Sequence, residues 1–253
     1  MDVMTEYLEN VRRILAGAIE TQHEAMEQGA RKMAEATLSG RSIFAFGCSH
    51  AGLLALELYY RSGGMATINP VRAAGLNLDI DPATMTSQME RLPEYGRLII
   101  DNIPLGEGDV ILIHSVSGRN TVTVDAAMRA REKGAFVIAL TSLSATTQVT
   151  SRHPSGKNLY EVADLVLDNG GCLGDGCIAL VGVPEKIGPT STAVGAALLN
   201  AMMTRAVQRV IEAGGVPPVF VSANLDGGEA HNREMMRAYR NQIFYMGHER
   251  AGE

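Results

Sequence analysis

The chain has 253 residues, a formal net charge of −6, 46% hydrophobic residues and 20% charged residues. A chain of this length can bury a core that needs no disulfide or metal staple, in one large domain or two small ones. The acidic balance argues against a nucleic-acid partner, whose phosphates require a basic patch, and no apolar run approaches the ~20 residues of a membrane span.

The N-terminal sequence MDVMTEYLENVRRIL mixes acidic and basic residues. A signal peptide would instead begin with a cationic stretch that is followed by an apolar block. We therefore expect a cytoplasmic protein with no membrane partner.

An amphipathic helix is predicted over residues 3 to 38, where apolar residues such as Val3, Tyr7 and Val11 recur at spacings of three and four. Gly29 could divide this stretch into two helices, and Gly40 is a typical helix end.

Beyond residue 40, short apolar runs alternate with helical patterns. The runs are almost continuously hydrophobic, as expected when helices cover both faces of a parallel sheet. Residues 70–95 and 141–157 are polar and without a clear period, which is typical of functional loops. The predicted strands are 42–46, 66–69, 110–114, 135–140, 165–167 and 219–222, and the predicted helices are 50–61, 120–133, 190–213 and 226–239.

This alternation predicts an α/β fold, a doubly wound, flavodoxin-like, five-stranded parallel sheet with helices on both faces. We expect a single domain over residues 1–253, with an N-terminal helical segment (1–39), an α/β core (40–225) and a C-terminal helix (226–253).

The first turn that follows a predicted strand is GCSHAG, from Gly47 to Gly52. It is not a P-loop, because Leu53 and Leu54 stand where Lys and Ser or Thr are required. It is not a dinucleotide fingerprint either, because Ser49 replaces a required glycine. A glycine turn with a hydroxyl at a helix N-terminus can hold an anion or a sugar hydroxyl, although Ser49 could equally cap the helix.

The second turn, SVSGRNT, follows the predicted strand 110–114 and packs three hydroxyls and one amide around Gly118. A helix cap needs one such residue, whereas a phosphate needs several donors, so the pattern favours phosphate binding. The donors are Ser115, Ser117, Asn120 and Thr121.

Three cysteines give no pattern of a metal site. Cys48 lies in a predicted loop, and four residues separate Cys172 from Cys177 in a glycine-rich turn. Zinc sites usually combine ligand pairs of tight spacing, and no second pair follows here. The sequence therefore predicts neither a metal nor a cofactor, and it leaves the role of Cys172 and Cys177 open.

The turns of the forms GxSHxG and SxSGxN/T, set in a five-strand α/β unit, resemble the sugar isomerase (SIS) domain. That family includes sedoheptulose 7-phosphate isomerases, isomerase domains of glucosamine-6-phosphate synthase and N-acetylmuramic acid 6-phosphate etherases. The resemblance spans residues 40–225, with residues 187–193 similar to a family segment that ends in Ser-Thr-Lys. Residues 224–232 resemble the N-x-D-G-x-x-x-H-N segment of stand-alone bacterial SIS proteins.

The resemblance implies a phosphosugar ligand bound by the two turns and by the start of the helix at residue 190. Ala193 departs from the family pattern, because members that handle aminosugars have Lys there, which argues against a synthase-like role. The implied binding residues are Gly47, Ser49, Ser115, Ser117, Gly118, Asn120, Thr121, Ser191 and Thr192.

Three residues are candidate acid–base catalysts. The resemblance assigns an acid–base role to Glu57, which could alternatively form a plain helix ion pair with Arg61. His231 lies in a polar segment at the start of a helix, where a histidine can exchange protons at neutral pH, and His50 is a second base candidate. The other histidines are expected to be packing, surface or loop residues: His23, His114, His153 and His248.

In related SIS enzymes a C-terminal histidine reaches into the site of a neighbouring subunit, so the resemblance implies a homo-oligomer, a dimer or a tetramer, with sites near the subunit interface. The favoured function is isomerisation of a sugar phosphate by proton abstraction next to a carbonyl. The alternatives are an etherase-like lyase that removes a C3 substituent, a non-catalytic phosphosugar sensor and, less favoured, a nucleotide-cofactor enzyme.

Overall fold

The computed structural model describes residues 2–246, and its N-terminal part is one long helix, α1 (Val3–Leu38). The side chain of Asp2 caps the first turn of α1. Of the two possibilities that the sequence left open, one helix over residues 3–38 is observed, because α1 runs through Gly29 without interruption. A Cβ at Gly29 would lie 2.3 Å from the Met202 sulfur, so this glycine permits close packing against another helix.

The central sheet has five parallel strands in the order β2-β1-β3-β4-β5, which confirms the predicted flavodoxin-like order. Gly47 pairs with His114, and Thr141 pairs with Asp168, so the strands end together at one edge, here called the carboxyl edge. The strands are β1 (Ile43–Gly47), β2 (Ile68–Pro70), β3 (Val110–His114), β4 (Phe136–Thr141) and β5 (Leu165–Asp168).

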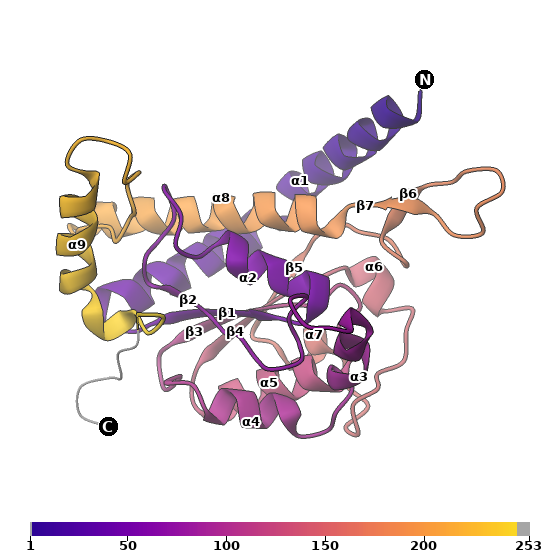
Figure 1. The fold of residues 1–253 in the computed structure, drawn as a ribbon, viewed down its shortest axis with the longest axis horizontal. Coiled ribbons are helices and arrows are strands. Elements are labelled where there is room, and N and C mark those ends of the chain that lie inside the picture. Colours follow the sequence, from indigo (N-terminus) through magenta and orange to yellow (C-terminus); the bar gives the residue numbers. More distant parts are fainter. Residues whose placement is uncertain (1, 247–253) are drawn as a thin grey trace.

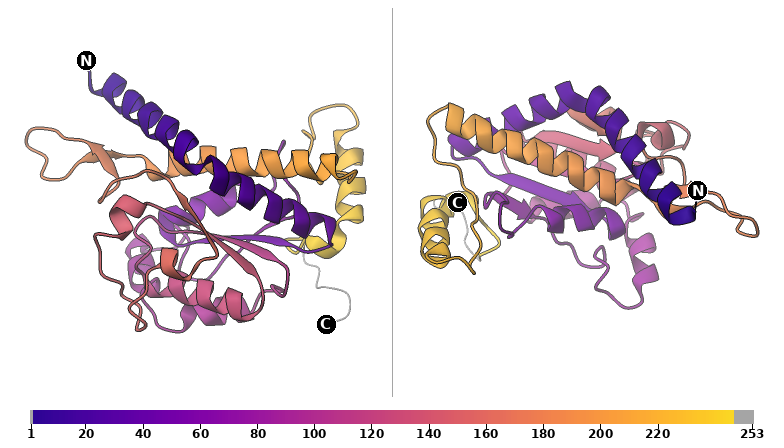
Figure 2. Two further views of the ribbon diagram at one scale, coloured as in Figure 1. Left: turned by 180° about the vertical axis from the view of Figure 1, so that it is seen from behind. Right: turned by 90° about the horizontal axis from the view of Figure 1, so that it is seen from above.

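Helices cover both faces of the sheet (Figures 1 and 2). Alternate residues of each strand point to opposite faces, so that Ile43 joins the core on one face and Phe44 the core on the other. One face is covered by α1, α2 (Leu53–Glu57) and α8 (Ser191–Glu212), and the other by α4 (Tyr95–Asp101), α5 (Thr121–Glu132) and α7 (Leu159–Val162).

Two predicted elements differ from the observed ones. The predicted helix 50–61 is a 3₁₀ turn (Ser49–Gly52) followed by the short α2, and Tyr60 has a left-handed φ of 48° that no α-helix accommodates. The predicted strand 219–222 does not join the sheet, and forms an isolated bridge between Val219 and Met65. Two prolines directly precede it, and a proline cannot donate to a strand ladder.

An antiparallel hairpin, not predicted from the sequence, is formed by β6 (Gly176–Ile178) and β7 (Ile187–Pro189). It projects beyond the sheet next to the start of α8 (Figure 1). The segments read as loops also contain short helices. These are η2 (Ala83–Met85), α3 (Thr86–Met89) and α6 (Leu143–Thr146).

The C-terminal part contains α9 (Gly228–Ala238) and the 3₁₀ turn η3 (Arg240–Gln242). The end of the predicted C-terminal helix, with His248, lies outside the described residues. None of the helices within residues 2–246 combines the length and apolar character needed to cross a membrane.

Candidate functional site

The two hydroxyl-rich turns lie side by side at the carboxyl edge. β1 pairs with β3 so that Gly47 is opposite His114, and the turns begin directly after these two residues. A Cβ at Gly47 would lie 2.6 Å from the Ala51 carbonyl oxygen, so the first turn can close only around a glycine. Ser49 adopts a left-handed φ of 55°, and its N–H donates to the Leu76 carbonyl at 2.7 Å.

The second turn folds tightly back on itself. The buried Ser115 hydroxyl accepts the Gly118 N–H at 3.2 Å. Gly118 has a φ of 59°, and a Cβ on it would lie 3.0 Å from the Thr146 hydroxyl, so both its conformation and its surroundings require glycine. Ser117 lies between these two residues and is partly exposed.

Asn120 and Thr121, two further residues of the predicted ligand set, also contact protein groups in this structure. Asn120 accepts a 2.7 Å hydrogen bond from Nη1 of Arg152, and its amide group also donates to Glu90. The Thr121 hydroxyl donates to the Arg152 carbonyl at 3.3 Å. These side chains fix the second turn in place, and their direct contact with a ligand stays a prediction.

Ser191 lies at the first turn of α8, where an aspartate that the sequence analysis did not single out occupies the helix start. The Asp175 carboxylate accepts the backbone N–H groups of Thr190 and Ser191 at 3.1 and 2.9 Å and the Ser191 hydroxyl at 2.6 Å. Like charges repel, so an anion bound by Ser191 would lie beside this carboxylate or displace it. Thr192, the next residue, is partly buried.

His114 ends the central strand β3 and is buried, with 3% of its surface exposed. Its Nδ1 lies 3.1 Å from the Ala51 carbonyl and donates to it, while its buried Nε2 has no hydrogen-bond partner among the described residues. Burial lowers the pKa of His114 to about 4, with the charge of Asp175 opposing that shift in part. His114 was expected only to pack at the end of its strand, and its unpaired Nε2 was not predicted from the sequence.

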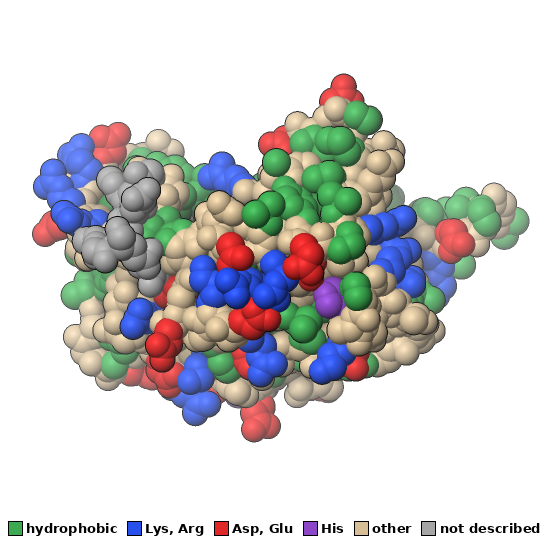
Figure 3. Space-filling view, turned by 90° about the horizontal axis from the view of Figure 1, so that it is seen from below, with side chains coloured by type: hydrophobic (Ala, Val, Ile, Leu, Met, Phe, Trp, Pro, Cys, Tyr) green, Lys and Arg blue, Asp and Glu red, His purple; other side chains and the backbone are tan. Residues whose placement is uncertain are grey.

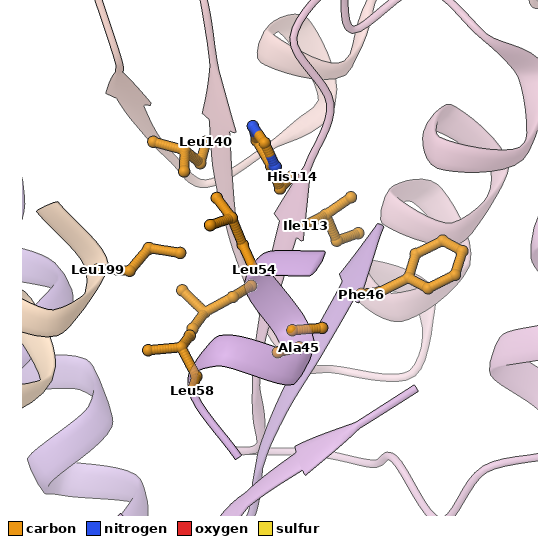
Figure 4. Close-up of a pocket in the computed structure, with 10 residues that line it drawn as sticks. Ala45, Phe46, Leu54, Leu58, Ile113, His114, Leu140 and Leu199 are labelled. Carbon is orange, nitrogen blue, oxygen red and sulfur yellow. The ribbon is translucent and has the colours of Figure 1, made fainter. Parts of the chain in front are cut away.

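A small cavity of about 10 Å³ lies between α2 and the sheet, and His114 is one of its lining residues (Figure 4). The other walls are apolar, with Leu54, Leu58 and Leu199 among them. The volume is at the lower limit for one water molecule. A sugar phosphate does not fit in this volume, so the cavity is not the predicted ligand site.

The acid–base candidates lie in different places. Glu57 is the last residue of α2, with 37% of its side chain exposed; it forms an ion pair with Arg61 and accepts the Asn200 amide at 3.2 Å. This is the ion-pair alternative that the sequence left open. His50 is exposed and lies in the first turn, directly after Ser49.

His231 is exposed in the first turn of α9, and its Nε2 lies 3.3 Å from the Val219 carbonyl. In Figure 1, α9 stands beside the end of α8 that is remote from Ser191. A single chain therefore does not bring His231 to the turns at the carboxyl edge. No group of three or more His, Cys, Asp or Glu in residues 2–246 is arranged to hold a metal ion.

A family model described as the SIS domain matches residues 6–142. A UPF0309 protein of Shouchella clausii is 43% identical to this chain over 246 residues, which cover 97% of this chain and 100% of the relative. A UPF0309 protein of Oceanobacillus iheyensis is 42% identical over the same length, with the same coverage.

Similar structures share the fold at low sequence identity. A phosphoheptose isomerase from Francisella tularensis superposes with a TM-score of 0.54 at 16% identity, covering 81% of this chain and 96% of that chain. A phosphoheptose isomerase from Neisseria gonorrhoeae gives a TM-score of 0.52 at 16% identity, covering 80% and 96%. The chain therefore belongs to the SIS domain family and to its UPF0309 group.

Proposed function

We propose that this protein binds a sugar phosphate at the carboxyl edge and isomerises it by removing a proton next to the carbonyl. The observation that carries the proposal is the pairing of Gly47 with His114, which brings two glycine turns rich in hydroxyls together where helices begin. The two similar structures are those of phosphoheptose isomerases, and this supports the same ligand class.

In this proposal the second turn binds the phosphate and the first turn binds the sugar. The partly exposed Ser117 and the backbone N–H groups around Gly118 offer donors to the phosphate oxygens. Ser49 and the exposed His50 lie across from them, where hydroxyl and carbonyl oxygens of the sugar would be within reach.

Isomerisation needs one base that takes the proton from the carbon next to the carbonyl and one acid that returns a proton to the neighbouring carbon. His50 lies in the first turn, so it is the base candidate that belongs to the same subunit as the two turns. Glu57 and His231 are the further acid–base candidates, and His231 would act from a neighbouring subunit.

The proposal includes a homo-oligomer, a dimer or a tetramer, with sites near the subunit interface. Support comes from the apolar side chains that α1 and the β6–β7 hairpin leave uncovered. Met4 and Leu8 on α1 are 72% and 66% exposed, and Ile187 on β7 is 42% exposed. Exposed apolar side chains that gather on neighbouring elements are typical of a protein–protein interface.

The test is a thermal-shift and calorimetric screen with aldose and ketose monophosphates, followed by solvent deuterium exchange at C1 and C2 of any ligand that binds. A ligand of the native state raises Tm through RT ln(1 + [L]/Kd). Ser117→Ala should weaken binding on the order of tenfold, because it removes one hydrogen bond to a charged group. Ser39→Ala, at the exposed end of α1, is the matched control.

The exchange experiment separates the possible activities. Deuterium at C2 with interconversion of aldose and ketose supports the isomerase, and release of a C3 substituent supports the lyase alternative. Binding without exchange supports the sensor. If no sugar phosphate of the panel stabilises the protein, the proposed function is wrong.

A further inference from the structure

Three arginines gather beside the second turn, where the sequence analysis placed the phosphate. Arg119 belongs to that turn, Arg91 follows α3, and Arg152 lies in the loop after α6. The backbone holds these segments together, since the Arg152 N–H donates to the Arg119 carbonyl at 2.8 Å and the Val122 N–H to the Glu90 carbonyl at 3.2 Å. Arg91, Arg119 and Arg152 are called the arginine cluster below.

The charges in the arginine cluster repel one another. The pKa of Arg152 is lowered by its burial and by the charges of Arg119 and Arg91, and Glu90 opposes this effect. Burial also raises the pKa of Glu90, so keeping this carboxylate ionised costs free energy. Glu90 is the acid whose charge acts on Arg152, whereas Arg119 and Arg91 both place positive charge beside it.

Arg119 has a hydrogen-bond donor that no protein group within residues 2–246 satisfies. Its Nε is buried and has no hydrogen-bond partner among the described residues. A buried donor without a partner is costly, and guanidinium donors are usually paired with anions.

Other arginines on the same side of the sheet are matched with acids. On the face formed by α4 and α5, Lys and Arg alternate with Asp and Glu over the surface (Figure 3). Arg97 pairs with Glu132 at 2.6 Å, and Arg129 pairs with Asp101 at 2.6 Å. The positive excess is therefore a local property of the arginine cluster and is not a general property of this face.

We propose that the arginine cluster binds a second anionic group of the substrate, so that the substrate is a sugar phosphate that also carries a second phosphate or a carboxylate. The inference rests on the proposed function, because it places the second anion next to the sugar phosphate bound by Ser117 and Gly118. A guanidinium fork matches the paired oxygens of either group, and α5 begins with its positive end at the same place.

The test compares ligands that differ by one anionic group. Calorimetry gives Kd for fructose 6-phosphate against fructose 1,6-bisphosphate, and for N-acetylglucosamine 6-phosphate against N-acetylmuramic acid 6-phosphate, whose lactyl group adds a carboxylate. The second anion should tighten binding on the order of tenfold in at least one pair. The pair that responds tells phosphate from carboxylate.

The variant Arg91→Gln should lose that tenfold gain and keep the Kd of the monophosphate within about threefold, because Arg91 lies outside the turn that binds the first phosphate. Arg119→Gln should lose the gain as well. Arg31→Gln removes the same charge from the exposed surface of α1 and should keep the gain. An unchanged Tm in each variant shows that the fold is retained.

If monophosphates bind and neither second anion helps, or if the gain survives in the Arg91→Gln/Arg119→Gln double variant, the inference is overturned and the proposed function stands. If no sugar phosphate binds, the proposed function fails, and inorganic pyrophosphate then tests the arginine cluster directly. A Tm increase with pyrophosphate that is absent in the double variant supports an anion site at the arginine cluster. If pyrophosphate does not raise the Tm of the unaltered protein, the arginine cluster is not an anion site.

Discussion

Asp175 holds the first turn of α8 through Ser191: its carboxylate accepts the Ser191 hydroxyl at 2.6 Å and the Ser191 backbone N–H at 2.9 Å. A carboxylate at this position satisfies helix donors that would otherwise lack partners and complements the positive end of the helix. The residue that the family resemblance assigns to the ligand is thus part of an internal cap.

Replacing Asp175 with Ala should lower the free energy of unfolding by about 1–2 kcal/mol, because the cap of α8 is lost. It should also strengthen the binding of inorganic phosphate if Ser191 contacts the ligand, because a negative charge is removed beside it. Urea unfolding and calorimetry measure the two effects. Asp226→Ala, at an exposed position, should change neither. Stability equal to that of the unaltered chain would contradict the capping role.

The turn after β1 should depend on Gly47. A Cβ there would lie 2.6 Å from a backbone carbonyl, so Gly47→Ala has to shift the turn. We expect a loss of about 1–3 kcal/mol in stability together with loss of sugar phosphate binding. Gly17→Ala is the contrasting variant, since nothing lies within 4 Å of a Cβ at this site in α1. It should stabilise the protein by about 0.5–1 kcal/mol, as a helix-interior glycine does when replaced by alanine. Equal effects of the two variants would refute the close approach at Gly47.

His114 should make the protein less stable in mild acid. Its pKa is about 4 in the folded chain, below the ordinary value of 6.5, so between these pH values the unfolded chain binds more protons. Stability from this group is complete above pH ~6.5 and falls as pH decreases towards 4, by up to about 3 kcal/mol. His114→Gln should lose this component of the pH dependence, and His23→Gln, on the exposed surface of α1, should keep it. Urea unfolding at pH 7 and pH 4.5 measures the loss of stability between these two pH values. An equal loss in His114→Gln and in the unaltered protein would contradict the role of His114.

Glu27 on α1 should stabilise the packing of α1 against α8. It forms an ion pair with Arg205 at 2.9 Å and with Arg209, and hydrogen bonds from these two arginines lower its pKa to about 2. The contribution is therefore present above pH ~4.5 and is lost as pH falls towards 2. About a third of each side chain is exposed, so solvent screens the pair, and Glu27→Gln should cost about 1 kcal/mol at pH 7. The unfolding free energies should converge near pH 2.5, and a difference that persists there would exclude the ionic explanation.

The strands of the sheet could be predicted from sequence because they are buried on both faces. Val110 to His114 is a continuous apolar run for this reason, and its boundaries are correct. The hairpin of β6 and β7 was missed because its strands have three residues each and are rich in glycine, so they have no measurable period. The Val219 run was misread because a short apolar stretch does not reveal whether a partner strand lies next to it.

The candidate site was predictable only in part, for a similar reason. The turns at Gly47 and Gly118 are local in sequence, and their position follows from strand ends. In the cap of α8, Asp175 contacts Ser191, which lies 16 positions away in the sequence, and the backbone of Asp175 is left-handed. No local sequence pattern indicates such a contact. The placement of His231 depends on where α9 packs, which its own amphipathic pattern does not determine.

The packing of α1 has a consequence for where the chain can be cut. Ala30 and Met33 of α1 are fully buried in the core between the sheet and α8. The sequence pattern places a boundary near residue 39, yet a chain that started there would expose that whole face of the sheet to water. The N-terminal helix is therefore a layer of the fold, and constructing a shorter active fragment would require replacing the apolar surface that it covers.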